Sequence, residues 1–277
     1  MGNGKARITA RWLVTLLLLL FGIVCLAPLA WMISTSFKFE VDVFEYPMRW
    51  IPRRINTKTY ERVFSDNSFL LYYLNSIKIT GIGVAGNLFF ASLAGYAFAR
   101  LRFKGSSVIF MIYLATMMVP NQIILAPKFM MFNWMKLYDT HLALILPGFF
   151  EVFGVFLLRQ AFKSVPMEFS EAALMDGAGQ LRVYFQIILP MVKPTLLTLM
   201  LLNFTSYWND YINPKTFLLS SELYPLTVGL QKFQISNSSN YSTIMAGTVV
   251  SLMPILIVFL VAQKYFVGSI ASAGLKG

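Results

Sequence analysis

The sequence predicts an all-α polytopic membrane protein, and composition and hydropathy are the two observations behind this prediction. Of the 277 residues, 57% are hydrophobic and 13% are charged, whereas a soluble domain has about 45–50% apolar and about 25% charged residues. The mean hydropathy is +0.64. A soluble enzyme of this length could not keep so much apolar surface out of water. The same numbers exclude a disordered chain, a coiled coil and a disulfide scaffold.

Six segments are long and apolar enough to cross a bilayer, which takes about 20 residues of helix. Their apolar cores lie between charged residues, and in the fourth the stretch His141–Leu158 is apolar except for Glu151. The expected spans cover residues 12–37, 76–99, 106–127, 141–162, 192–212 and 243–264. The first apolar run is longer than the roughly 7–15 residues of a signal-peptide core, so we expect it to be retained. With no evident repeat or linker, we interpret residues 1–277 as a single transmembrane domain.

The net charge of +11 fits loops beside anionic headgroups better than nucleic-acid binding. The basic residues lie between long apolar runs and do not cluster on a soluble face. Arg100, Arg102 and Lys104 make a tight basic turn between the second and third spans. Because basic residues favour the cytoplasmic side, we predict that both the N-terminus and the C-terminus are inside the cell.

A hydrophilic segment, residues 166–190, connects the fourth and fifth spans. Pro166 suits a helix start, Asp176–Gly177 is a turn signal, and Pro190 limits a second helix. We therefore predict a helix, a turn and a second helix at the cytoplasmic face. The apolar positions that would form one helical stripe are Leu174, Ala178, Leu181, Phe185 and Ile188. The alternative is an ordinary amphipathic connector that lies on the bilayer.

This segment resembles a known signature. Glu171-Ala172-Ala173, then Gly177, then Ile187-x-Leu189-Pro190 are similar to the EAA motif of the permease subunits of bacterial ABC importers. Other parts resemble the MalG-like carbohydrate permeases, which belong to the binding-protein-dependent transport inner-membrane component family. These parts are Thr35–Lys38, Asn75–Ser76, Ala91–Arg100, Leu142–Pro147, Phe156–Gln160, Ser206–Asp210 and Gly274–Gly277. The chain departs from the family pattern at Tyr207, an insertion, and at Thr59, where the family usually has Asn.

The resemblance implies a non-catalytic permease subunit that moves a sugar or oligosaccharide by alternating access. The sequence has no Gly-x4-Gly-Lys-Ser/Thr phosphate loop. ATP and Mg²⁺ would therefore belong to a partner ATPase, and we expect no cofactor in this chain and no nucleic acid. The implied partners are a second homologous permease, a cytoplasmic ABC ATPase dimer, an extracytoplasmic solute-binding protein and the sugar. The implied location is the bacterial cytoplasmic (inner) membrane.

The resemblance also assigns residues of the connecting segment to ATPase docking. They are Glu171, Ala172, Ala173, Asp176 and Gly177. The alternative for Ala173 and Gly177 is that they serve only to pack helices against each other.

Polar residues within the spans are candidates for the substrate path. A charge at mid-membrane costs about 2.5–3.5 kcal/mol on insertion scales, so a charged residue such as Glu151 within a span indicates a functional or structural role. We predict that Glu151 shares a helical face with Arg159 and lines the path, or else bonds to a neighbouring helix. In the fifth span, Asn203, Tyr207, Asp210 and Tyr211 recur at helical spacing and offer hydrogen bonds and aromatic faces to a sugar. The alternative is an interfacial aromatic belt. Asn121 and Gln122, after Pro120, are weaker candidates.

Two other classes of function compete. An ion-coupled secondary transporter should have several intramembrane acids or paired broken helices, and only Glu151 is well inside a span. A membrane enzyme should have a catalytic cluster near a span end. His141 stands alone there, and we expect a capping or interfacial role for it. One histidine and one cysteine also exclude a multi-ligand Cys/His metal site. Among permeases, glycerol phosphate or another polar solute remains an alternative cargo.

Overall fold

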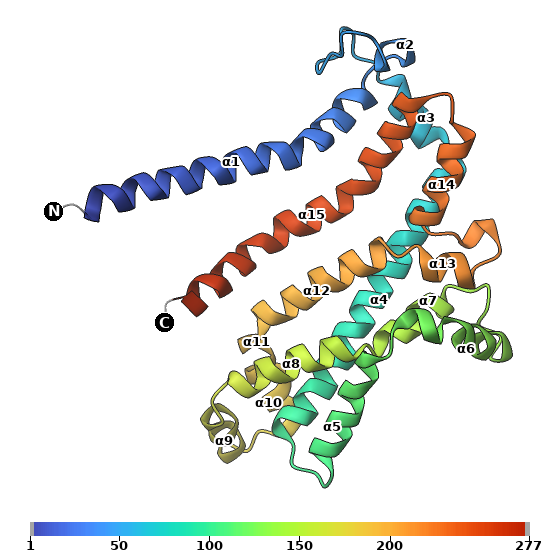
Figure 1. Cartoon of the computed structure of the whole chain (residues 1–277). Helices are drawn as coiled ribbons and strands as arrows, with labels where there is room; N and C mark the ends of the chain where they lie inside the picture. Colours follow the sequence, from blue (N-terminus) through green and yellow to red (C-terminus); the bar gives the residue numbers. More distant parts are fainter. Residues whose placement is uncertain (1–2, 275–277) are drawn as a thin grey trace. The chain divides into compact units, whose positions relative to one another are not determined.

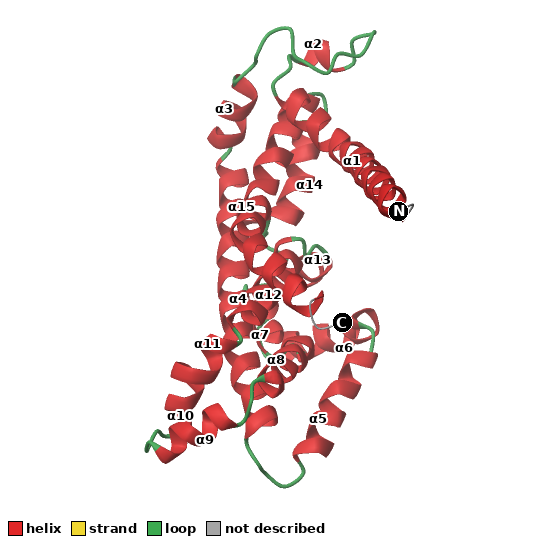
Figure 2. Cartoon of the chain, turned by 90° about the vertical axis from the view of Figure 1, so that its left-hand side faces the viewer, coloured by secondary structure: helices red, strands yellow, loops and turns green. Residues whose placement is uncertain are grey.

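The computed structural model describes residues 3–274, with side chains for residues 11–263. Leu275–Gly277, the end of one segment that carries the family resemblance, lies outside the described residues. The described part consists of helices and loops and contains no strand (Figure 2). The all-α prediction is therefore confirmed. The chain divides into two compact units, and the division falls inside α4 (Asn67–Arg100), α14 (Leu226–Ser236) and α15 (Tyr241–Gly274).

The first unit contains the residues up to Phe69 and Leu230–Leu252. Its helices are α1 (Asn3–Ser36), α2 (Glu40–Val43), α3 (Lys58–Ser65) and the adjoining parts of α4, α14 and α15. The residues at the end of α1 pack against the loop that follows. Thr59 Oγ1 donates to the Ser36 carbonyl over 2.7 Å. Thr59, where the sequence departs from the family pattern, thus contacts a segment that carries the resemblance.

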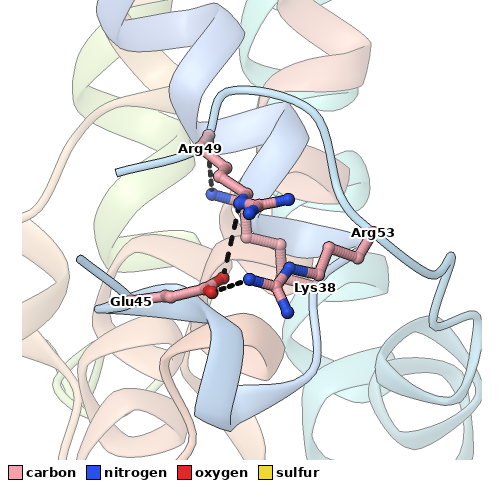
Figure 3. A network of polar contacts seen from close by, with 4 residues as sticks. All are labelled: Lys38, Glu45, Arg49 and Arg53. Carbon is pink, nitrogen blue, oxygen red and sulfur yellow. Dashed lines mark hydrogen bonds and ion pairs between the residues drawn. The ribbon is translucent and has the colours of Figure 1, made fainter. Parts of the chain in front are cut away.

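A polar network closes this loop (Figure 3). The Lys38 side chain is buried, donates to the Arg49 carbonyl over 2.6 Å, and lies 3.8 Å from the centre of the Trp31 ring. Glu45 forms an ion pair with Arg53 and a second with Arg49 at 3.8 Å. Burial lowers the pKa of Lys38, against the opposing pull of nearby carboxylates. The loop is therefore held by charge and by aromatic contact together.

The second unit contains Leu70–Gly229 and the residues from Met253 onward. Its helical elements, besides the adjoining parts of α4, α14 and α15, are α5 (Ser106–Ala115), η1 (Thr116–Met118), α6 (Asn121–Trp134), α7 (Leu142–Phe149), α8 (Val152–Ser164), α9 (Glu168–Met175), α10 (Gln180–Val183), η2 (Tyr184–Ile188), α11 (Leu189–Met191), α12 (Lys193–Trp208), α13 (Ile212–Phe217) and η3 (Ser221–Leu223) (Figure 1). Its apolar core joins α4, α5, α8, α9 and α10 to η2 and α12.

Four stretches of helix are long and apolar enough to span a membrane: Arg11–Ser36, Asn67–Arg100, Leu142–Ser164 and Tyr241–Gln263. Two further pairs qualify only if each bent pair counts as one span. Ser106–Met118 with Asn121–Trp134 bends by 100°, and Gln180–Met191 with Lys193–Trp208 bends by 78°. The chain thus has four to six candidate spans. The predicted third span is not one straight helix, because Pro120 ends one helical stretch and α6 starts in a new direction.

The fourth of the six predicted spans, which corresponds to Leu142–Ser164, is also interrupted. α7 ends at Phe149 and α8 begins at Val152. Glu151, between them, has an extended backbone with φ −65° and ψ 127°. The prediction that Glu151 and Arg159 share one continuous helical face is therefore wrong, because the helix does not run through Glu151.

The predicted stripe of the connecting segment is wrong at three of its five positions. Leu174, Leu181 and Phe185 are exposed, whereas Ile188 is buried and Ala178 is half-buried, as predicted. Ala173, Val183 and Tyr184, which the stripe left out, are buried. The turn at Gly177 interrupts the helical period, and η2 is a π-helical turn that shifts it again. The helix–turn–helix prediction itself is confirmed.

Side chains from distant parts of the second unit hold the segment between α13 and α14. The Asp139 carboxylate accepts the Leu219 and Ser220 backbone N–H groups over 2.8 and 2.9 Å and the Ser220 hydroxyl over 2.5 Å. These bonds, the Ser220 hydroxyl first, lower the pKa of Asp139. His141 is buried, and its Nε2 bonds to the Leu223 carbonyl at 2.9 Å, so it does not cap the helix that follows.

Candidate functional site

The first candidate site is the elbow, defined as α9, the turn through Gly179, α10 and η2. Gly177 has φ 78°, a left-handed conformation that glycine adopts without strain. Its N–H donates to the Leu174 carbonyl over 3.1 Å, and the Ala178 N–H donates to the Ala173 carbonyl over 3.0 Å. This pair of bonds is the glycine-terminated helix end known as the Schellman motif. A Cβ at Gly177 would meet nothing within 4 Å, so the turn projects from the chain.

The five predicted docking residues of the elbow differ in solvent exposure. Glu171, Ala172, Asp176 and Gly177 are exposed, and Met175 beside them is 83% exposed. Ala173 is 8% exposed and belongs to the core of the second unit. A partner could therefore reach four of the five, while Ala173 fills space inside the chain.

Buried aromatic side chains fasten the elbow to the long helix α4. The Tyr184 hydroxyl bonds to Ser92 Oγ at 2.6 Å, and the Tyr96 hydroxyl donates to Gln180 Oε1 over 3.3 Å. The Tyr96 ring lies 5.0 Å from the Tyr184 ring and 5.8 Å from the Phe162 ring, centre to centre. Sequence reasoning missed these contacts. Ser92 and Tyr96 do lie in the Ala91–Arg100 segment, which drew notice only for its family resemblance.

Arg100, at the end of α4, adds a polar attachment near the elbow. Its Nη2 donates to the Phe162 carbonyl over 2.7 Å and also to the Val165 carbonyl. Both acceptors lie where α8 ends and the chain turns into α9, so the guanidinium satisfies carbonyls that a helix end leaves free. The elbow is thus bound to α4 by packing and by hydrogen bonds.

The second candidate site is the break in the fourth predicted span, defined as Phe150 and Glu151 between α7 and α8. Two carbonyls there accept hydrogen bonds from side chains: Asn87 Nδ2 donates to Gly148 O over 2.5 Å, and the Tyr113 hydroxyl donates to Phe150 O over 2.8 Å. Asn203 Nδ2 in turn donates to Asn87 Oδ1 over 2.6 Å. Both asparagines are buried, with exposures of 0% for Asn87 and 4% for Asn203.

Three of the predicted path residues gather beside this break. Tyr207 packs between Gly83 and Gly148, where a Cβ on either glycine would overlap the Tyr207 side chain. Glu151 is exposed at the break, and Asp210 accepts the Asn213 backbone and side-chain N–H groups over 3.2 and 2.9 Å. The charges of both carboxylates act on Tyr207. The arrangement offers an aromatic hydroxyl and two carboxylates, which are groups that hydrogen-bond to hydroxyl groups.

The other predicted path residues lie elsewhere or serve the fold. Asn203 is committed to the buried bond with Asn87. α12 ends at Trp208, so Asp210 and Tyr211 lie beyond the helix and the predicted four-residue helical face is wrong. Asn121 and Gln122 are exposed in the first turn of α6, and no hydrogen bond joins them to Glu151, Tyr207 or Asp210 among the described residues. No group of three potential metal ligands was found among the residues that the structure describes.

The apolar helices, with their exposed elbow and polar break, define an all-α polytopic membrane protein. Residues 87–272 match the family model described as the binding-protein-dependent transport system inner membrane component, and the chain belongs to this family. The chain is 32% identical to the galactooligosaccharides permease GanQ of Bacillus subtilis, with 99% of this chain and 98% of GanQ covered. It is 29% identical to the arabinooligosaccharides permease AraQ of Halalkalibacterium halodurans, with 96% of each covered.

Solved structures agree with this assignment. A chain from the crystal structure of a bacterial ABC transporter involved in the import of the acidic polysaccharide alginate is 32% identical and gives a TM-score of 0.84. The match covers 95% of this chain and 98% of that one. A second chain, from an alginate ABC transporter in complex with a periplasmic protein, shares the fold at 15% identity, with a TM-score of 0.69 and 95% and 96% covered.

Proposed function

We propose that this chain is the permease subunit of an ATP-driven importer that carries a sugar or oligosaccharide into the cell. The observation that carries the proposal is the match along nearly the whole chain to permeases named for oligosaccharide transport. The chain would work with a second homologous permease, an ABC ATPase dimer that holds ATP and Mg²⁺, and an external solute-binding protein. It would cross the bacterial cytoplasmic membrane six times, with both ends inside.

The elbow is the proposed contact with the ATPase. Glu171, Ala172, Asp176 and Gly177 are exposed on it, and Met175 adds an apolar side chain that a partner could bury. Closing of the ATPase on ATP would move the elbow. The Tyr184–Ser92 hydrogen bond and the rings around it would pass this movement to α4. The energy enters because the ATPase binds two conformations of the permease with different affinity, which is the basis of alternating access.

The break in the fourth span is the proposed substrate path. Glu151, Tyr207 and Asp210 would contact the sugar, and Tyr211, Asn121 and Gln122 remain weaker candidates. Glycerol phosphate or another polar solute is the alternative cargo.

The first test is copurification. We expect the tagged chain, extracted from its own cells in mild detergent, to bring an ABC ATPase and a second permease with it. A purified assembly without an ATPase would contradict the proposal.

The second test is sugar-stimulated ATP hydrolysis by the assembled complex with its binding protein. Tyr207→Phe and Asp210→Asn should each raise the sugar concentration for half-maximal stimulation, by about tenfold if one hydrogen bond worth roughly 1.4 kcal/mol is lost. Thr198→Val is the matched control, because Thr198 bonds only to a carbonyl of its own helix. An unchanged dose response in both path variants would remove these residues from the path.

A further inference from the structure

We propose that Asn87 and Asn203 are positioning residues of the transport path, because they hold the break in the fourth span where it presents Glu151 and Tyr207. This inference rests on the proposed function, since it concerns the path described there. Neither asparagine is exposed enough to touch cargo. Their role would be to fix the backbone that carries the path.

The first step concerns the backbone of the break. Inside a bilayer, a carbonyl without a hydrogen bond costs several kcal/mol, so an interrupted span persists only where other groups satisfy it. At this break, Gly148 O and Phe150 O accept side-chain donors from α4 and α5, Asn87 and Tyr113. The break is therefore a specified feature of the chain, with donors from two other helices.

The second step concerns the orientation of Asn87. Its amide can donate to Gly148 only when the Nδ2 end points toward α7. The bond from Asn203 Nδ2 to Asn87 Oδ1 at 2.6 Å stabilises this orientation, because the oxygen end is then occupied by a donor from α12. Asn203 thus acts on the break through Asn87, and three helices are linked in series.

The third step concerns packing at the same place. A Cβ added to Gly154 would lie 3.0 Å from Asn87 Oδ1, 3.1 Å from Ala91 Cβ and 3.2 Å from Leu199 Cδ2. α4, α8 and α12 therefore meet here without room for another side chain. Because packed interiors switch between discrete arrangements and do not deform smoothly, a change in the amide pair should displace the break as a whole.

The fourth step connects the amide pair to the path. Gly148 receives Asn87 on its carbonyl, and the Tyr207 side chain lies against its Cα. Gly148 is also three residues before Glu151, whose N–H donates to the Gly148 carbonyl over 3.3 Å. One residue thus joins the amide pair to both path side chains.

The test uses the assembled complex in liposomes, with Asn87→Leu, Asn203→Leu and the double variant. The readout is the amount of sugar imported per ATP hydrolysed by correctly assembled complex. Each single variant should lower this ratio by about tenfold, the effect of losing roughly one hydrogen bond in a buried site. The double variant should be no worse than Asn87→Leu, because Asn203 acts through Asn87. Thr205→Val, an exposed change on the same helix as Asn203, should leave the ratio unchanged.

Two results would overturn the proposal. Additive losses in the double variant would show that Asn203 acts independently of Asn87. Less assembled complex with a normal ratio would show that the pair only stabilises the fold.

A second measurement needs no sugar. In a Cys25→Ser background, Glu151→Cys places the chain's one cysteine at the break, and a water-soluble thiol reagent reports its accessibility in the full complex. Asn87→Leu should change the modification rate several-fold, and Thr205→Val should not. Equal rates in all backgrounds would refute the positioning role. An unmodified complex that imports no sugar would instead contradict the proposed function, and the rates of cysteine modification could still be compared.

Discussion

The elbow and the break in the fourth span are both interruptions between helices, but they are stabilised in opposite ways. At the elbow, the chain closes its own helix end: Gly177 takes a left-handed conformation, and backbone N–H groups two and three residues past the end of α9 satisfy its carbonyls. At the break, Gly148 O accepts Asn87 Nδ2 in addition to the local Glu151 N–H, and Phe150 O accepts the Tyr113 hydroxyl. Asn87 and Tyr113 are 61 and 37 residues away in the sequence from the residues they bind.

This difference follows from the surroundings of each interruption. Water can satisfy whatever an exposed turn leaves unpaired, so local residues suffice. An interruption within an apolar span has no water to rely on and needs donors from neighbouring helices. The exposed turn is therefore free to serve a partner, while the inner break is tied to the packing of the whole unit.

Of the variants that test this difference between the elbow and the break, the largest effect on transport is expected at Gly177. Gly177→Val forces a β-branched side chain into a left-handed conformation, which costs roughly 1–3 kcal/mol locally, and it adds bulk to the proposed ATPase contact. We expect uptake to be lost while membrane insertion remains normal, measured by transport and by the amount of chain in the membrane.

Gly179→Val is the matched control for that variant. Gly179 is equally exposed and equally free of neighbours, but its φ is −73°, which any residue adopts. It should transport nearly as well as the unmodified chain. Normal uptake by Gly177→Val would remove the elbow from ATPase docking.

A smaller effect should separate the two faces of the elbow at Ala172 and Ala173. Ala173→Leu inserts volume into a packed core and should lower the stability of the complex by about 1–3 kcal/mol, measured by thermal unfolding. Ala172→Leu changes an exposed residue, so stability should hold while affinity for the ATPase falls. If both variants unfolded alike and both kept the ATPase, α9 would be a packing element only.

The smallest effect is expected at Asp139, whose carboxylate holds the distant segment between α13 and α14 through Leu219 and Ser220. The pKa of Asp139 is lower in the folded chain than in the unfolded one, because the bound N–H and hydroxyl groups of Leu219 and Ser220 favour the carboxylate. Its stabilising contribution is therefore complete above the unfolded pKa of about 4 and is lost as the pH falls through the folded pKa.

Hydrogen exchange of the Leu219 and Ser220 amides measures this contribution. Their protection, relative to unstructured peptides, should fall with acid in the unmodified chain and be low at every pH in Asp139→Asn. Glu61→Gln, an exposed carboxylate elsewhere, should behave as the unmodified chain. Protection that is independent of pH would contradict the role of the carboxylate.

Sequence reasoning succeeded where structure is local. Composition identified the class, apolar runs located four of the spans, and Asp176–Gly177 predicted the turn of the elbow. It failed where distant residues decide. Pro147–Gly148, just before Glu151, is a turn signal, but the donors that satisfy the break, Asn87 and Tyr113, are on other helices and could not be foreseen. The predicted stripe through residues 174–188 was wrong at Leu174, Leu181 and Phe185, because the turn at Gly177 and the π-helical turn η2 break a single helical period. Site roles that depend on a partner stay predictions.

The last consequence concerns α4. Between Asn87 and Tyr96 this helix is uninterrupted, so at about 1.5 Å per residue some 14 Å of rigid rod separates the attachment of the break from that of the elbow. A continuous α-helix is stiff along its axis. A displacement at the elbow would therefore reach the break with little loss, and its size there would depend on the contacts that attach each site to α4.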